Sequence, residues 1–551
     1  MNLSFRNYSN ISFFLFLVLI VNLFQAAFTE LTGDEALYWM HGQNLDWGFR
    51  DHPPVIGAMI KIGYGIFRSE LGVRLLIALA NALTIFLIWK LIKPQSLTAF
   101  VLLVLSIPVL SIYGFMATPD VPLLLAVAIY LHVWKAFLEE QNLRISLLLG
   151  VAMAALMWSK YHGFFIIVLM MLPHVKLWFN KYFWLGGLIG IVLYSPHIIW
   201  QIVNDLPTVK FHLNDRNSDK WELKHILGYA GGQFLVFNPI VFITTIWLLV
   251  KTKAHDDFEK SLRWFFVGLL LFFLFDSTRG RVEPHWTAPL SFVAVYLMLL
   301  HIEIKSGLKF GLGFFVFVIT IGRIGLMVDF IPRLHREFHR NKAKMLTLQE
   351  VAGDQPVCFM NSYQNPSLYM FYTGGIAHSI NNEDGGKNQY DYWNYNEYIH
   401  QKPFVFVANY DKGGFEHVNS GDFDFHIKKY NDLPVMHGLY ILTDDWLHKV
   451  LVGDSISIPA TIINRNNYGL QLEGGSHAIS WIAKFNHKKP NQVSPELQIV
   501  HLPTYLGAQD SARIVFQFVV PKLEGKNYLF IEAQVDDLGP TIQSNKMRVE
   551  L

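Results

Sequence analysis

The sequence predicts a polytopic α-helical membrane protein with water-exposed domains after its last membrane span. Of the 551 residues, 52% are hydrophobic and 15% aromatic, which is too apolar for a water-soluble protein of this length. Charged residues nevertheless make up 16% of the chain, more than a bare helix bundle would carry. A membrane part joined to a water-exposed part accounts for both figures.

The composition and motif content also exclude several classes of protein. A net charge of +2 provides no basic surplus for nucleic-acid binding. The single cysteine, Cys358, excludes an intrachain disulfide and any zinc site built on paired cysteines. The sequence contains no P-loop, no GxGxxG between a strand and a helix, no HExxH and no GxSxG, so a nucleotide-using enzyme is not indicated.

The N-terminal apolar segment allows two interpretations. Arg6 and the apolar run 11–24 could form a secretory signal peptide that is cleaved near Ala26. They could equally form a retained first helix. We expect retention because the apolar character continues to Phe28, near the length that spans a bilayer.

Ten more apolar runs are long enough, or nearly long enough, to span a membrane, which gives about 11 spans in all. They are Gly72–Ile92, Leu97–Met116, Val121–Leu138, Ile145–Ser159, Phe164–Val175, Phe183–Trp200, Leu227–Val250, Leu262–Phe275, Trp286–His301 and Phe310–Phe330.

Basic residues in the short loops predict the orientation. Alternate loops carry lysine and arginine, as the positive-inside rule requires of the cytoplasmic side. This places the N-terminus in the cytoplasm and the segments after residue 330 outside it. The expected location is a bacterial inner (plasma) membrane.

The predicted domains are a transmembrane domain at 1–330, an extracytoplasmic α/β domain at 331–440 and a β-sandwich at 441–551. Residues 331–344 are basic and helical in pattern, which suggests a connector along the membrane surface. Short apolar strands with Gly- and Asn-rich turns then indicate the α/β domain. Alternation of period two in the last hundred residues indicates the sandwich.

Chemistry-bearing residues gather on the predicted extracytoplasmic side. The stretch Thr32–Pro54 follows the first span and contains four acidic residues, two histidines and an arginine. Ionisable groups are costly at a bilayer edge without a partner or a task, so such clusters are functional-site candidates. Four further clusters fall on the same side: 117–120, 159–162, the long connection Pro196–His225, and Thr278–His285 with its RGRVEPH. We therefore expect one composite site.

Each candidate also has a structural interpretation. Asp120 could simply cap the helix that follows it, and Asp34 with Glu35 could cap a helix ahead of Ala36. Lys160 could be a lysine whose charged end reaches out to the membrane surface.

Three ordered motifs carry a resemblance to a known family. They are GDEALYW followed by DWGFRDHPP in the first loop, TPDVPLL around Asp120, and WSKYHG around Lys160. In this order, on one side of the membrane, they resemble the C-type (GT-C) membrane glycosyltransferases. The closer resemblance is to the family that joins protein O-mannosyltransferases, lipid A aminoarabinose transferases and their bacterial relatives. The NQYDYW segment at 388–393 is similar to the tail of some bacterial members.

The resemblance implies an inverting transfer of a sugar from a polyprenyl phosphate donor to an acceptor hydroxyl. The acceptor would be lipid A, another envelope glycan or a protein. Asp34 would be the general base, with Glu35 and Asp120 as further catalytic acidic residues. The departing phosphate needs cations aimed at it. The expected substrate-binding residues are Tyr38, Asp51, His52, Lys160, Tyr161, Arg279, Arg281 and His285.

One departure from the family concerns the donor side. Asp51-His52-Pro53-Pro54 stands where the aminoarabinose branch carries Glu-Lys-Pro-Pro. Histidine is shorter than lysine and only partly charged near neutral pH, so phosphate contact by His52 is less assured. A divalent metal held by Asp51 and His52 is the alternative; no other cofactor is implied.

Two other classes of function compete with an enzyme. A transporter or flippase of lipid-linked sugars would use the carboxylates for ion coupling. The chain shows no evident hydropathy repeat and its polar clusters do not lie at mid-membrane, which speaks against transport. A non-catalytic protein could instead capture glycan with its terminal sandwich.

Overall fold

The computed structural model describes residues 5–549, except 211–220, 382–386, 409, 412, 421–422, 444–445, 448–450, 486–494, 496, 523–526 and 546. The chain divides into two compact units. The helical unit comprises Met1–Asn341, and the C-terminal unit comprises Lys342–Leu551. The predicted division of residues 331–551 at residue 441 stays a prediction.

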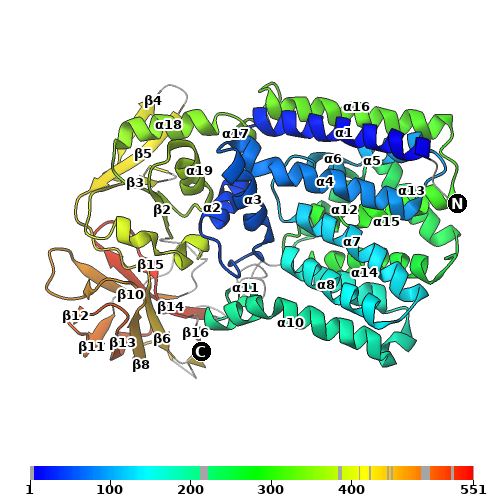
Figure 1. The fold of residues 1–551 in the computed structure, drawn as a ribbon. Coiled ribbons are helices and arrows are strands. Elements are labelled where there is room, and N and C mark those ends of the chain that lie inside the picture. The colour runs from blue at the N-terminus through cyan, green and yellow to red at the C-terminus, as the bar shows by residue number, and fades with distance from the viewer. Residues whose placement is uncertain are drawn as a thin grey trace. The chain divides into compact units, whose positions relative to one another are not determined.

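The helical unit is a bundle of apolar helices joined by short loops (Figure 1). Its helices are α1 (Phe5–Phe28), α2 (Gly33–Gln43), α3 (Val55–Ile66), α4 (Glu70–Ile92), α5 (Leu97–Ser106), α6 (Pro108–Ile112), α7 (Asp120–Glu139), α8 (Leu143–Ser159), α9 (His162–Met171), α10 (Lys181–Val203), α11 (Pro207–Lys210), α12 (Leu223–Phe237), α13 (Pro239–Lys251), α14 (Asp257–Asp276), α15 (Leu290–His301), α16 (Ser306–Met327) and α17 (His335–Phe338). Two 3-10 turns, η1 (Val175–Phe179) and η3 (Pro284–Thr287), complete it.

Local sequence explains where many of these helices begin. Asn142, Asn180 and Asp256 each accept hydrogen bonds from backbone amides of the first turn of α8, α10 and α14. Five described helices are long and apolar enough to cross a membrane: α1, α4, α7, α10 and α16. The pair α12 and α13 passes the same test together. The polytopic class is therefore confirmed, whereas the number of spans stays a prediction.

Two predicted continuous runs are broken in the structure. The run 97–116 divides at Pro108, and the run 227–250 divides at Asn238-Pro239 with a bend of 104°. Proline removes a backbone donor from a helix and leaves carbonyls to be satisfied elsewhere. A side chain at the second break satisfies a carbonyl at the first, because Asn238 Nδ2 donates to the Ser106 carbonyl at 2.7 Å.

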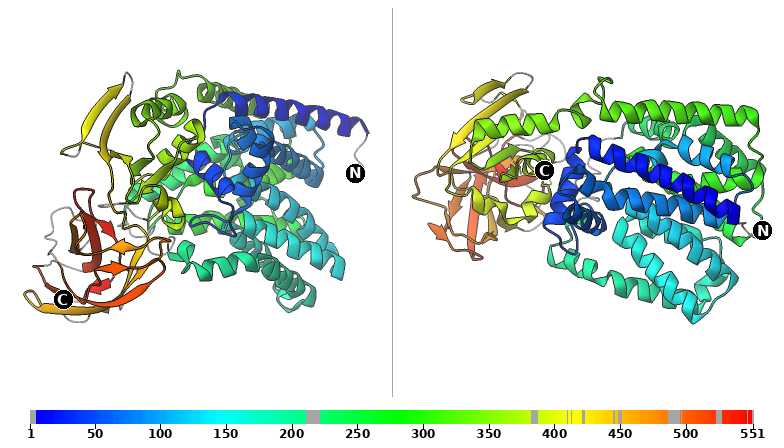
Figure 2. Two further views of the ribbon diagram at one scale, coloured as in Figure 1. Left: turned by 60° about the vertical axis from the view of Figure 1, so that its left-hand side comes forward. Right: turned by 45° about the horizontal axis from the view of Figure 1, so that its top comes forward.

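One end of the bundle collects the residues with unusual chemistry. Helices α2 and α3 lie at this end, away from the N-terminus (Figures 1 and 2). The starts of α4 and α7 and the ends of α8, α10 and α16 meet them there. We call this the α2 end.

The C-terminal unit begins with an α/β sheet in the order β2-β1-β3-β5-β4. β1 is parallel to β2 and β3, whereas β5 pairs antiparallel with β3 and β4. The elements are α18 (Asn341–Ala352), α19 (Gln364–Thr373), η4 (Gln389–Tyr392), η5 (Asn394–Tyr398), β1 (Val357–Met360), β2 (Ala377–Ile380), β3 (Phe404–Ala408), β4 (Glu416–Ser420) and β5 (Phe423–Tyr430).

The rest of the unit forms two facing sheets, ordered β10-β14-β16-β7 and β11-β13-β8-β6. Their strands are β6 (Leu439–Thr443), β7 (Trp446–Leu447), β8 (Ser455–Asn464), β10 (Ile479–Phe485), β11 (Gln498–Val500), β13 (Ser511–Val519), β14 (Asn527–Val535) and β16 (Met547–Val549). The short strands β9 (Leu470–Gln471) and β12 (Tyr505–Leu506) form a separate two-stranded sheet, and β15 (Thr541–Ile542) pairs with β14. Alternate side chains of β8 and β13 are buried. A sandwich was expected from this alternation.

The α/β sheet and the sandwich share one hydrophobic core. Phe404 and Phe406 of β3 belong to the same buried cluster as Ile462 of β8 and Trp481 of β10. The two parts of the C-terminal unit are therefore packed together, although their patterns in the sequence differ.

Candidate active site

The site begins at the first turn of α2. Thr32 is the N-cap residue, and its side chain and backbone exchange hydrogen bonds with Glu35 in a capping box. Asp34 lies in the same turn with an exposed side chain, whereas Glu35 is fully buried. The capping interpretation therefore holds for Thr32 and Glu35. The carboxylate of Asp34 is accessible.

Glu35 is held by a buried arginine that the sequence analysis did not single out. Arg74 of α4 donates to Glu35 through Nε (2.7 Å) and through a terminal nitrogen (2.6 Å). The same guanidinium donates to the carbonyls of Ala26, Thr29 and Glu30, so it ties α1, α2 and α4 together. Both side chains have 0% exposure.

The Glu35 carboxylate also reaches a second loop. Its Oε1 accepts a hydrogen bond from the backbone N–H of Ala117 at 2.8 Å. Ala117 precedes Asp120 by three residues in the loop before α7. The acidic turn of α2 and the Asp120 segment are thereby linked through one carboxylate.

A second cluster brings together three residues that the sequence predicted for the site. Lys160 Nζ donates to Asp120 Oδ1 at 2.8 Å, and both side chains are buried. His285 Nε2 lies 3.8 Å from the other carboxylate oxygen of Asp120. The histidine side chain is 40% exposed, so this cluster opens to the surface on one side.

These contacts decide two of the structural alternatives. Pro119 is the N-cap residue of α7, and Asp120 makes no side-chain capping hydrogen bond. Lys160 is 4% exposed, so its charged end does not reach out to the membrane surface. The two side chains instead form an ion pair with each other.

The first loop is fastened to the end of α10. Trp47 O lies 2.8 Å from His197 Nδ1, and Trp200 Nε1 donates to Asp46 Oδ2 at 2.7 Å. Gly48 lies between these contacts, where an added Cβ would stand 2.5 Å from the Trp200 ring and 2.8 Å from His197. Only glycine fits this approach without displacing the loop.

Tyr161 lies beside the same part of the loop. Its hydroxyl is within hydrogen-bonding distance of His197 Nε2 (3.1 Å) and Thr208 Oγ1 (3.0 Å). Burial raises the pKa of Tyr161, and the nearby charge of Asp51 raises it further. The phenol therefore stays protonated, and Asp51 lies close enough to contribute to the raised pKa of Tyr161.

Tyr38 and His52 form the other wall of this region. Tyr38 is buried in α2 and meets the His52 ring edge to face, with centroids 5.7 Å apart. His41 stacks on Phe49 at 3.8 Å. The predicted donor-side residues are thus gathered around the part of the first loop that leads into α3.

Two predicted cations are placed differently. Arg279 stacks on the ring of Phe275 at 4.9 Å, and Arg281 pairs with Glu283 at 3.0 Å while 77% exposed. Among the described residues, these contacts lie within their own segment. The structure does not bring either arginine to Asp120.

Asp51 and His52 are the residues predicted to hold a metal. In the described part of the chain, the one group of three such side chains is His255, Glu259 and His301, at the opposite end of the bundle. Arg263 occupies the same Glu259 oxygen at 2.6 Å, which makes this an ion-paired cluster and a poor cation site. A metal at Asp51 and His52 stays a prediction.

A partly buried arginine in α16, Arg323, was also missed from the sequence. Arg323 donates to Gln25 at 2.5 Å and to Asn22 at 2.8 Å, and its guanidinium lies 5.1 Å from the Phe115 ring centroid. Arg74 lies 6.0 Å from the same ring. A charged residue inside an apolar run is the signal that could have identified both arginines.

Comparisons with known proteins agree with the sequence resemblance. A family model described as dolichyl-phosphate-mannose-protein mannosyltransferase matches residues 51–200. A lipid A galacturonosyltransferase, RgtD, from Rhizobium johnstonii is 24% identical over 304 residues. The match covers 52% of this chain and 63% of that relative.

Solved structures show the same fold. ArnT from Cupriavidus metallidurans in the apo state has a TM-score of 0.58 at 13% identity, covering 77% of this chain and 98% of that one. The form bound to undecaprenyl phosphate has a TM-score of 0.57 at 12% identity, covering 76% and 98%. The predicted GT-C fold is confirmed, and so is the resemblance to this group of glycosyltransferases.

Proposed function

We propose that this protein is an inverting glycosyltransferase, because its chain has the fold and the ordered motifs that resemble those of the C-type membrane glycosyltransferases. It moves a sugar from a polyprenyl phosphate donor to an acceptor hydroxyl on lipid A, another envelope glycan or a protein. The observation that carries the proposal is that the α2 end holds both the accessible carboxylate of Asp34 and the buried Lys160–Asp120 ion pair, linked through the hydrogen bond from Ala117 to Glu35. RgtD and ArnT, whose names and bound lipid indicate such chemistry, support it.

Asp34 is the proposed general base. A hydroxyl becomes a competent nucleophile when a positioned carboxylate takes its proton in the transition state. Asp34 is exposed, whereas its neighbour Glu35 is committed to Arg74, Thr32 and Ala117. Glu35 therefore serves as a positioning residue that fixes the turn carrying Asp34. The proton-accepting role falls to Asp34 alone.

The displacement requires stabilisation of the leaving phosphate. The acceptor oxygen forms a bond to the anomeric carbon as the bond from that carbon to the phosphate oxygen breaks, and the acceptor proton passes to Asp34. Lys160 has three N–H donors, of which one is used on Asp120. The other two, together with His285, can meet the phosphate, and Asp120 holds the lysine in place.

The donor pocket is proposed to include Tyr38, Asp51, His52 and Tyr161. Tyr161 presents a protonated phenol beside Asp51. Where a divalent metal binds, Asp51 and His52 would hold it next to the donor phosphate. Arg279 and Arg281 are proposed to act at the entrance, because they are exposed on the segment that precedes His285.

The proposed orientation follows the positive-inside rule. The α2 end and the C-terminal unit lie outside the cytoplasm, and the N-terminus lies inside. A reporter fused to the C-terminus should be active only in the extracytoplasmic compartment. Cytoplasmic reporter activity would contradict this orientation.

The test of the proposed function is the variant Asp34→Asn in purified protein with a polyprenyl phosphate sugar. Loss of the base should lower the transfer rate by about 10² to 10⁴-fold. Glu139→Gln, an exposed carboxylate at the far end of α7, is the matched control. Transfer at the wild-type rate in Asp34→Asn would overturn the proposal. Sugar-lipid transport without any transfer would favour the transporter alternative.

A further inference from the structure

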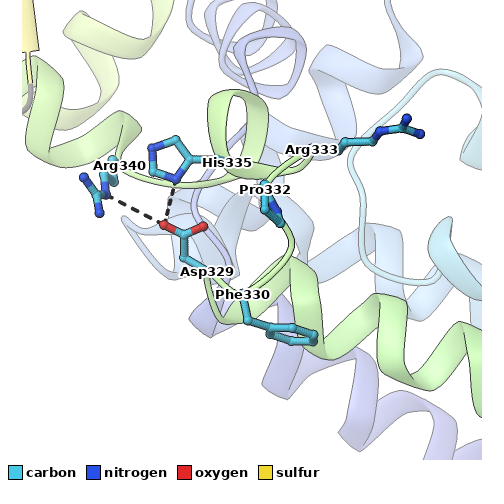
Figure 3. Close-up of a pocket in the computed structure, with 6 residues that line it drawn as sticks. All are labelled: Asp329, Phe330, Pro332, Arg333, His335 and Arg340. Carbon is cyan, nitrogen blue, oxygen red and sulfur yellow. Dashed lines mark hydrogen bonds and ion pairs between the residues drawn. The ribbon is translucent and has the colours of Figure 1, made fainter.

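A hollow after α16 and a groove beside α13 both lie apart from the residues assigned above. In the hollow, the carboxylate of Asp329 lies 2.8 Å from His335 Nδ1 and 3.8 Å from Arg340 Nε. Arg333 points away from these three side chains (Figure 3). The carboxylate there already has basic neighbours. The groove beside α13 differs, because its wall is apolar and ends at a lysine.

The groove lies in the angle of the bend between α12 and α13, and its volume is about 400 Å³. Phe234 of α12 and Phe242 of α13 both line it. Their rings meet edge to face across the bend, with centroids 5.5 Å apart. The two helices diverge by 104° at the bend, so their side chains meet close to it and leave a groove further along.

The wall that α13 contributes to the groove is apolar and exposed. Ile243, Trp247 and Val250 line the groove, and the side chain of each is exposed. Exposed apolar surface on a membrane helix lies against hydrocarbon, because contact with water would be unfavourable. From Ile243 to Lys251 the helix rises about 12 Å, close to the roughly 15 Å of hydrocarbon in one leaflet. The groove therefore suits an acyl chain from one leaflet.

A basic residue stands at the end of this wall. Lys251 is the last residue of α13, and among the described residues that line the groove it alone is charged. The next acidic residues in the chain are directed elsewhere, since Asp256 caps α14 and Asp257 lies 3.9 Å from His174. Trp247 precedes Lys251 by one turn, and tryptophan is enriched at the level of lipid headgroups. A lysine at this level, beside an apolar wall, matches an anionic headgroup.

We propose that the groove binds an anionic phospholipid. One acyl chain lies in the angle between α12 and α13, and the phosphate accepts a hydrogen bond from Lys251 Nζ. The chain contacts both helices and so stabilises the bend. In the proposed orientation, this lipid belongs to the cytoplasmic leaflet, so its site is separate from the donor and acceptor sites at the α2 end.

The first experiment measures lipid binding and needs no transfer. The protein is placed in phosphatidylcholine nanodiscs with graded fractions of phosphatidylglycerol, and the retained lipids are counted by native mass spectrometry. Lys251→Gln should bind phosphatidylglycerol about fivefold more weakly, which corresponds to about 1 kcal/mol for one basic residue near the surface. Lys251→Arg should bind it as the wild type does.

Two control variants separate this lysine from the general positive charge of the protein. Lys176→Gln removes an exposed lysine from another loop that is predicted to be cytoplasmic. Arg333→Gln removes an exposed arginine after α16, at the α2 end. Neither change should alter phosphatidylglycerol binding. A loss in Lys176→Gln equal to that in Lys251→Gln would overturn the proposal, because any basic residue on that side would then have the same effect.

The second experiment fills the groove. Ile243→Trp places a larger apolar side chain there and should remove one retained phosphatidylglycerol per protein. Ile199→Trp on α10 is the matched control, because Ile199 and Ile243 are both 59% exposed. Phosphatidylglycerol should also raise the unfolding midpoint of the wild type more than phosphatidylcholine does, since a ligand of the folded state stabilises it. This rise should be lost in Ile243→Trp and in Lys251→Gln.

Three results would overturn the proposal. Unchanged phosphatidylglycerol binding in Lys251→Gln would remove the phosphate from the lysine. Unchanged binding in Ile243→Trp would remove the acyl chain from the groove. Displacement of the retained phosphatidylglycerol by added polyprenyl phosphate would assign the groove to the tail of a polyprenyl lipid.

Discussion

Two buried ion pairs lie at the α2 end, and they differ in how completely their polar atoms are used. In the Arg74–Glu35 pair, every guanidinium nitrogen donates and both carboxylate oxygens accept from further groups. In the Lys160–Asp120 pair, the described residues supply one hydrogen bond to the ammonium, and a half-exposed His285 stands at the second oxygen. The first pair fixes backbone, whereas the second leaves ammonium donors that the proposed function assigns to the donor phosphate.

This difference predicts that breaking the first pair affects folding most. Arg74→Met leaves the Glu35 carboxylate buried without its cation, which should cost about 3–5 kcal/mol. Thermal unfolding of the detergent-purified protein measures the loss. The double variant Arg74→Met with Glu35→Leu should recover most of the stability, because no charge is left buried. An unstable double variant would show that the pair also determines the backbone arrangement.

Breaking the second pair should affect catalysis more than folding. Lys160→Met removes the cation that the proposed function assigns to the leaving phosphate, so kcat should fall by about 10²–10³-fold. The expected unfolding midpoint lies closer to the wild type than that of Arg74→Met, because His285 still faces Asp120. Kinetics with the polyprenyl phosphate sugar and thermal unfolding are measured on the same preparation. A wild-type kcat in Lys160→Met would show that this pair stabilises the fold and takes no part in the transfer.

A third buried polar cluster, in the C-terminal unit, extends the comparison to pH. Burial lowers the pKa of His378 to about 3, next to the bonded pair His437 and Asp391. Between these two pH values, His378 is protonated in the unfolded chain but stays neutral in the folded chain. The free energy of unfolding therefore falls as the pH drops from about 6.5 toward 3. At pH 4.5 the loss should be about 2–3 kcal/mol.

The measurement is the unfolding of the full chain at pH 7 and pH 4.5. His378→Leu should flatten the pH dependence, whereas His417→Leu, which replaces a half-exposed histidine of the same unit, should not. Equal pH dependence in the wild type and His378→Leu would contradict the assignment.

The smallest expected effect concerns the carboxylate that faces the first pair. The pKa of Glu337 is raised by burial and by Asp34 and Glu35, so its ionised form opposes folding as pH rises through that range. Glu337→Gln should therefore stabilise the protein at pH 7, by less than about 1 kcal/mol because the side chain is only partly shielded from solvent, which screens these charges. A lower unfolding midpoint in this variant would mean that Glu337 makes a favourable contact.

The two pairs also show which parts of the site could be predicted from the sequence. Hydropathy and loop charge predicted a common side for Asp120, Lys160 and His285, and the structure brings these three together. Glu35 was grouped with Asp34, because neighbouring positions on a helix turn cannot be separated into buried and exposed without knowing what packs against them. Its partner Arg74 lay inside an apolar run that was assigned to the membrane as a whole.

Breaks in helices were the other feature that the sequence did not reveal. Pro108 and Pro239 each interrupt a run that is apolar on both sides, and a proline within an apolar run can bend a helix as well as end it. Arg279 and Arg281 were grouped with His285 because they are close in the chain. Local stacking and pairing turn them away from it.

The junction between these breaks has a mechanical consequence. Helix α12 packs on the η3 turn, where Gly232 admits the Pro284 ring and Gln233 accepts a hydrogen bond from Thr287 at 2.7 Å. His285 is part of that turn. The bend at Asn238 therefore separates α13 from the packed pair formed by α12 and η3. A tilt of α12 and η3 about Asn238 would therefore change the separation of His285 and Asp120, which lie far from Asn238 in the sequence.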